Sequence, residues 1–183
     1  MIESGTTYTV GALVQANYGS RELLRIAGVP VGREIGPKVV PAHFSGRGPN
    51  PQNEQGSSII VVLATDAPLL PIQYQRLTRR ATTGLAWVGG IGANGSDDLL
   101  IAFSTANHVG QTDKITKVQM LAPDAMTNLL RAAAEATEEA ILNALCMAET
   151  MIGRNGRTIH ALPLDALQEI MRHNQPEQTR VTI

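Results

Sequence analysis

The feature that most constrains what this chain can fold into is an abrupt change of composition at Ser58. Residues 36–57 are rich in proline, glycine, asparagine and glutamine, which is typical of a linker without regular structure. The linker ends at Ser57 and Ser58, and the apolar, β-branched run Ile-Ile-Val-Val-Leu-Ala follows at once. Such a run is typical of a buried strand. The sequence therefore predicts a strand at 58–65 that begins with a hydroxyl group behind a flexible linker.

A serine in this position is what a self-cleaving N-terminal nucleophile requires. The linker allows the peptide bond before Ser58 to be strained and attacked, and the strand then holds the new N-terminal serine rigidly. Many strands begin with serine, however, so the spacing alone favours the simpler interpretation of a loop-to-strand boundary.

The remaining pattern predicts an α+β protein. Strands are expected at 7–16 and 99–104 as well as at 58–65, with a partner strand or short extension at 21–26. Helices are expected from the Asp66 cap to about residue 86, at 124–151 and at 163–173. The glycine-rich stretch before 97 contains Asn94-Gly95, the usual signal of a tight hairpin. Strands and helices come in runs, so we expect layers rather than a regular βαβ winding.

Composition excludes several classes of protein. The 183 residues are 43% hydrophobic and 17% charged, with a net charge of −1, so no basic excess indicates nucleic acid or a membrane surface. The sequence has no apolar run of the roughly 18–20 residues that a membrane span needs and no secretory signal, so we expect a cytoplasmic location. Its single cysteine, Cys146, excludes an internal disulfide. No cluster has metal-ligand spacing, so neither a metal nor another cofactor is expected.

Several motifs occur together in an order typical of one peptidase family. They are the segments at 8–19, 28–34, 58–71, 77–81, 95–107, 141–153 and 160–164. With these motifs the chain resembles the serine β-aminopeptidases, also called L-aminopeptidase/D-esterase-amidases or DmpA-like peptidases. The resemblance covers nearly the whole chain.

This resemblance implies a four-layer αββα sandwich like that of N-terminal nucleophile hydrolases and ornithine acetyltransferases. Family members are considerably longer, so the chain is expected to be a C-terminal portion that is incomplete at its N-terminus. Residues 1–57 then correspond to the end of the α segment with the linker. Residues 58–183 correspond to a whole β segment, and both parts belong to one domain.

The family pattern places the nucleophile immediately before the apolar run, which selects Ser58 over its rival Ser57. Self-cleavage would occur between these two residues. The freed α-amine, with an ordinary pKa of about 7.7–8.0, could then act as the base for the Ser58 hydroxyl, so no histidine is needed.

The resemblance also implies three supporting residues. Asn17 would donate to the oxyanion, although a strand-end asparagine that satisfies a turn is the ordinary alternative. Ser96 and Asp98 stand two apart, so both side chains could converge on Ser58 from a neighbouring strand. Their alternative is a polar turn before a strand, and Asp97 is expected to be solvated. Residues 104–107 are either part of the site or a structural turn.

The expected function is that of an autoprocessed serine aminopeptidase. It would release N-terminal residues from short peptides, amides or esters, including β-amino acid or D-amino acid substrates, through an acyl-enzyme on Ser58. The family implies a homo-oligomer of αβ units, with neither nucleic acid nor membrane as partner. Two alternatives remain: a catalytically silent, truncated subunit, and an acyltransferase of the ornithine acetyltransferase type, whose nucleophile is threonine in a different motif.

Overall fold

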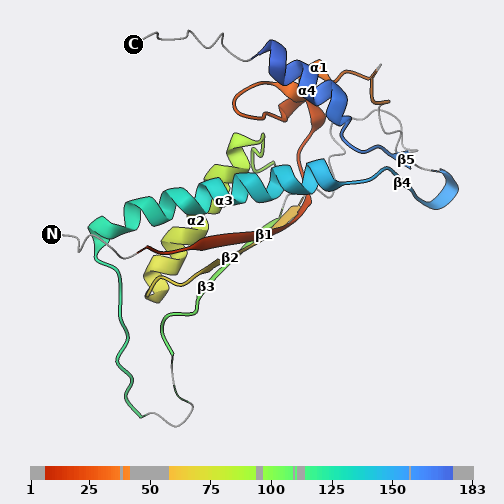
Figure 1. Cartoon of the computed structure of the whole chain (residues 1–183). Coiled ribbons are helices and arrows are strands. Elements are labelled where there is room, and N and C mark those ends of the chain that lie inside the picture. Colours follow the sequence, from red (N-terminus) through yellow and green to blue (C-terminus); the bar gives the residue numbers. More distant parts are fainter. Residues whose placement is uncertain are drawn as a thin grey trace, which may run out of the picture.

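The computed structural model describes residues 7–37, 39–41, 58–93, 97–108, 110, 114–156 and 158–174. Its centre is a three-stranded sheet in the order β1-β2-β3. Strand β1 (Val10–Asn17) is antiparallel to β2 (Ser58–Thr65), and β2 is parallel to β3 (Asp97–Ser104). Helices α2 (Pro71–Trp87) and α3 (Met126–Met147) pack against each other and against the sheet (Figure 1).

Smaller elements surround this centre. A 3-10 helix, η1 (Arg21–Leu23), follows β1 and contacts the short helix α1 (Val31–Glu34). Helix α4 (Leu164–His173) lies against α1, at the top of Figure 1. The strands β4 (Met151–Ile152) and β5 (Thr158–Ile159) form a small hairpin after α3. Two further 3-10 helices, η2 (Pro123–Ala125) and η3 (Arg154–Gly156), precede and follow α3.

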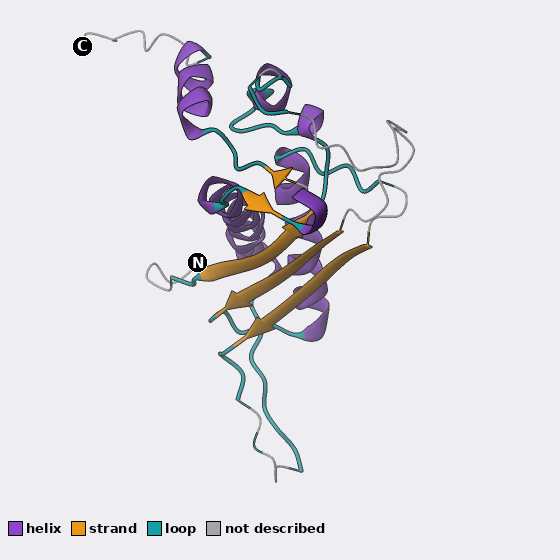
Figure 2. Ribbon diagram, turned by 90° about the vertical axis from the view of Figure 1, so that its right-hand side faces the viewer, coloured by secondary structure: helices purple, strands orange, loops and turns teal. Residues whose placement is uncertain are grey.

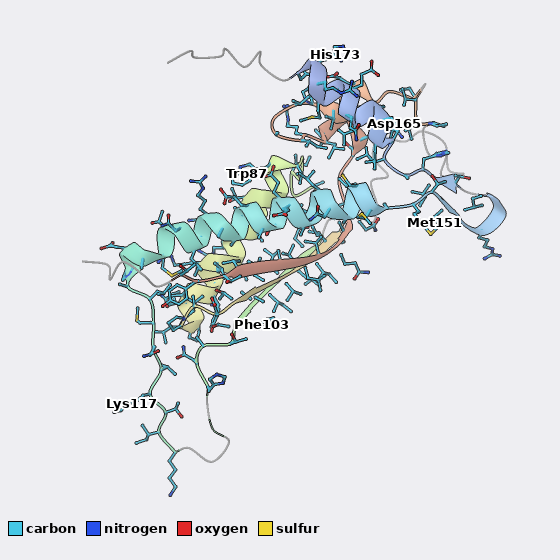
Figure 3. The ribbon with its side chains drawn as sticks, viewed as in Figure 1. Trp87, Phe103, Lys117, Met151, Asp165 and His173 are labelled. Carbon is cyan, nitrogen blue, oxygen red and sulfur yellow. The ribbon has the colours of Figure 1, made fainter. Side chains whose placement is uncertain are left out.

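The alternation along β2 decides which side of the sheet the helices cover. Ile59, Val61, Leu63 and Thr65 are buried beneath the helices, and the residues between them point to the other face. That other face is apolar as well, and in Figure 2 the helices lie to one side of the sheet. We call the face that the helices leave uncovered the open face. It is formed by Leu13, Ile60, Leu99, Ile101 and Phe103, each of them at least 38% exposed (Phe103 is labelled in Figure 3).

Three local predictions were wrong. Residues 21–26 form η1 and one isolated bridge from Ile26 to Val29 rather than a strand. Asp66 does not cap α2, because its Oδ1 accepts a hydrogen bond from the Thr9 backbone N–H at 2.7 Å. The cap position is Leu70, whose N–H donates to Gln73 Oε1 at 3.1 Å.

The third wrong prediction is the hairpin before β3. A two-residue hairpin joins antiparallel neighbours, whereas β2 and β3 are parallel and α2 crosses between them. The chain thus contains one βαβ unit beside an antiparallel strand, and Asn94-Gly95 lies outside the described residues. The α+β class is confirmed.

Residues 104–107 have a structural role at the far end of the sheet from Ser58. Ser104 Oγ donates to the Ala67 carbonyl at 2.6 Å. Asn107 exchanges two hydrogen bonds of 2.9 Å with the backbone of Gln119. Thr65 Oγ1 donates to the Thr9 carbonyl at 2.6 Å. These bonds satisfy backbone groups where the ladders end.

The contact between α2 and α3 depends on Gly84. A Cβ built there would overlap the carbonyl oxygen of Ala134 and lie 3.0 Å from Thr137 Cβ. Thr137 is fully buried and donates to the Ala133 carbonyl at 2.7 Å, so this turn of α3 has little freedom to move.

We therefore expect Gly84→Ala to lower the free energy of unfolding by about 1–3 kcal/mol, because the helices must separate. Gly11→Ala is the matched control, since its Cβ meets nothing within 4 Å. Urea unfolding followed by circular dichroism measures both variants. Equal midpoints for Gly84→Ala and wild type would contradict the close contact.

Candidate active site

The first and last residues of two neighbouring strands meet at one end of the sheet. Asn17 ends β1, Ser58 begins β2, and the two are register partners. Directly opposed residues of antiparallel strands share a face, with Cβ atoms about 4.5–5.5 Å apart. Ser58 is half-buried and Asn17 is exposed, and both lie on the side of the open face. The structure thus brings together the residues that sequence reasoning suggested as nucleophile and oxyanion donor.

The third strand begins at this end with Asp97 and Asp98. Asp97 is the register partner of Ser58, and Asp98 is the partner of Ile59. Because side chains alternate, Asp98 belongs to the row of Ile59, on the side that the helices cover. It is half-buried there and lines a cavity of about 20 Å³ with Tyr18 and Leu85. Ser57 and Ser96 lie outside the described residues, so their roles stay predictions. The side chains of Asp98 and Ser58 point to opposite sides of the sheet, so the expected convergence on the Ser58 hydroxyl is not seen for Asp98, and its role toward the Ser58 α-amine stays a prediction.

Tyr18 lies beside Asp98 at the candidate site and was not singled out from the sequence. Burial, and after it the negative charge of Asp98, raise the pKa of Tyr18 well above its usual value. The hydroxyl therefore stays protonated at ordinary pH and remains a potential donor beside Asp98. The only sequence signal was its position directly after Asn17.

A second cavity, of about 360 Å³, runs along the chain that follows Asn17. Its walls combine residues 16–21 with apolar side chains of α3, among them Ile141 and Leu145. Arg21 also lines it, and this arginine was likewise missed. Its guanidinium donates from Nη1 to the Val40 carbonyl at 2.7 Å and from Nη2 to the Pro41 carbonyl at 3.3 Å.

Other kinds of site find no support in the part of the chain that the structure describes. Within it, no group of three or more His, Cys, Asp or Glu side chains could hold a metal ion. None of the helices described is both long and apolar enough to cross a membrane.

A nucleophile candidate at the start of a central strand, with an amide donor on the adjoining strand, is the arrangement of N-terminal nucleophile hydrolases. Solved structures support this class. The L-aminopeptidase D-Ala-esterase/amidase of Ochrobactrum anthropi, described as a new variant of the Ntn hydrolase fold, superposes with a TM-score of 0.77 at 39% identity. The match covers 93% of this chain and 45% of that one.

Two further solved structures superpose on this chain about as well. The PH0078 protein of Pyrococcus horikoshii OT3 has a TM-score of 0.78 at 44% identity, over 92% of this chain and 44% of that one. A β-aminopeptidase of Burkholderia sp. has a TM-score of 0.75 at 43% identity, over 91% and 44% of the two chains.

The family model for peptidase family S58 matches residues 1–159, and the chain belongs to this family. It is 45% identical over 177 residues to the β-peptidyl aminopeptidase BapA of Sphingosinicella microcystinivorans. The match covers 92% of this chain and 44% of BapA, so the chain spans less than half the length of this relative.

Proposed function

We propose that the chain carries the nucleophile of an autoprocessed serine aminopeptidase. The observation that carries this proposal is the register pair Asn17–Ser58, which stands at the end of the sheet in a member of a peptidase family. The substrates would be short peptides, amides or esters with a free N-terminal residue. The relatives are named for β-peptides, for L-amino acids and for D-alanine esters and amides, which supports a wide tolerance at that residue.

Self-cleavage comes first. The Ser58 hydroxyl attacks the Ser57 carbonyl, and the acyl group moves from the Ser58 nitrogen to its oxygen. Water then hydrolyses the resulting ester, which gives the Ser57 carboxylate and a Ser58 with a free α-amine and a free hydroxyl. The break falls where the proline- and glycine-rich segment meets β2.

Hydrolysis of substrate uses the freed groups. The α-amine takes the hydroxyl proton as Ser58 Oγ attacks the carbonyl of the substrate's N-terminal residue. The Asn17 amide donates to the oxyanion that forms, and the ammonium returns the proton to the leaving amine or alcohol. Water then releases the acyl group. Ser96 would hydrogen-bond the nucleophile, and Asp98 would orient Ser96 and stabilise positive charge on the amine.

The alternatives are less well supported. An acyltransferase of the ornithine acetyltransferase type would have threonine as its nucleophile, whereas this chain has Ser58 and belongs to a peptidase family. A silent subunit is the stronger rival, because the open face leaves large apolar side chains in water. The same exposure supports a homo-oligomer of αβ units.

The direct test is hydrolysis of the p-nitroanilides of L-alanine, D-alanine and β-alanine by the complete gene product. We expect Ser58→Ala to lower kcat on the order of 10³-fold or more, because the nucleophile is lost. Ser57→Ala is the matched control, one residue away, and should retain activity. Loss of activity in Ser57→Ala but not in Ser58→Ala would assign the nucleophile to Ser57 and contradict the proposal.

A second prediction separates the two adjacent carboxylates. Asp98→Asn should lower kcat by about 10²-fold, because the positive charge on the amine loses its partner. Asp97→Asn removes the same charge one residue away and should stay within about threefold of wild type. Steady-state kinetics with one of the anilides decides between them. The opposite result would transfer the role to Asp97, the register partner of Ser58.

A further inference from the structure

Arg21 joins two chain segments that are far apart in the sequence. Its Nη1 and Nη2 groups donate to the carbonyls of Val40 and Pro41, at 2.7 and 3.3 Å. The two bonds span 19 and 20 residues of sequence. A guanidinium is planar and permanently charged, so it can hold two neighbouring carbonyls at once and keep their direction fixed.

The backbone at Arg21 is held as firmly as its side chain. A Cβ on Gly32 would overlap the Arg21 carbonyl oxygen, so α1 packs directly against this peptide. The same carbonyl accepts the Leu24 N–H at 3.1 Å, and the Gly32 N–H donates to the Leu24 carbonyl at 3.2 Å. Side chain and backbone of Arg21 therefore fix η1 between α1 and the segment 39–41.

The fixation of Arg21 bears on the candidate site because the β1–β2 ladder ends at the proposed oxyanion donor, Asn17. Asn17 pairs with Ser58 in the last register position, and the chain then leaves the sheet. Gly19 follows with φ +78°, a left-handed conformation that glycine adopts readily. The residues just beyond Asn17 set the direction in which the chain leaves this position, and Arg21 is only four positions along the chain.

We propose that Arg21 is a positioning residue for the Asn17 amide. It ties the chain just beyond Asn17 to the carbonyls of Val40 and Pro41, and so keeps the amide aimed at the oxyanion that forms when Ser58 attacks. This inference rests on the proposed function, because it assumes that Asn17 stabilises the oxyanion. It predicts that Arg21 acts on the rate of reaction rather than on substrate binding.

The test is a double-mutant cycle on kcat and KM with the complete gene product, using Asn17→Ala, Arg21→Gln and the pair. We expect Asn17→Ala to lower kcat by about 10²–10³-fold. Arg21→Gln alone should lower kcat by about tenfold and leave KM unchanged, because small errors in alignment are costly. In the Asn17→Ala background, Arg21→Gln should have no further effect, since the group it positions is gone.

Two more variants separate positioning from folding. Arg25→Gln is the matched control, because Arg25 is exposed and donates to the Gly28 carbonyl, three residues away, at 3.5 Å. It should behave as wild type. Arg21→Lys keeps the charge but not the planar fork, and its kcat should fall between those of wild type and Arg21→Gln. Thermal unfolding of each variant shows whether the protein is folded. If Arg21→Gln does not fold, Arg21→Lys takes its place in the cycle.

Each outcome has a distinct meaning. If Arg21→Gln lowers kcat by the same factor with and without Asn17, Arg21 does not act through that amide and the inference is overturned. The inference is also overturned if Asn17→Ala lowers kcat but Arg21→Gln leaves kcat unchanged. If Asn17→Ala itself keeps full activity, it is the oxyanion assignment in the proposed function that fails, and the inference falls with it.

Discussion

The site depends on the antiparallel ladder between β1 and β2 and on its register. Side chains alternate along a strand, so the burial of Ile59, Val61 and Leu63 beneath the helices forces Ser58 onto the opposite face. The same register sets Asn17 against Ser58. A slip of one residue would bury Ser58 and expose Ile59. The aliphatic core therefore fixes the position of the proposed nucleophile Ser58 and of its register partner Asn17.

The Ser58 side chain lies on the open face of the sheet. The open face continues from Ser58 along the sheet as a row of exposed apolar side chains. Exposed patches of this kind mark interaction surfaces in soluble proteins. Whatever covers this face would also form a wall beside Ser58. Substrate selection would then come from that wall, which fits relatives more than twice as long as the matched segment.

The sequence allowed the main elements to be predicted, but not the way they pair. The apolar run after Ser58, the strand ending at Ser104 and the helices α2, α3 and α4 follow from local periodicity and from helix-start signals. The parallel pairing of β2 with β3 does not, because it depends on how α2 packs back onto the sheet. Asp66 illustrates the same limit: its sequence context favoured a helix cap, whereas its partner Thr9 is 57 residues away.

Some residues of the candidate site could be predicted from the sequence, and others could not. Ser58 and Asn17 could be named from their motifs, because strand ends are visible in the sequence. Tyr18 and Arg21 could not, because the groups that they lie against, Asp98 and the carbonyls of Val40 and Pro41, come near them only in the folded chain. Tertiary contacts of this kind leave no periodic signal.

Self-cleavage at Ser58 can be measured as the intact mass of the purified protein under denaturing conditions. We expect a break between Ser57 and Ser58 in the wild type, which divides the 183-residue chain into fragments 1–57 and 58–183, and a single uncut species in Ser58→Ala. A wild-type protein that stays uncut, or a Ser58→Ala variant that is still cut at this bond, would contradict it.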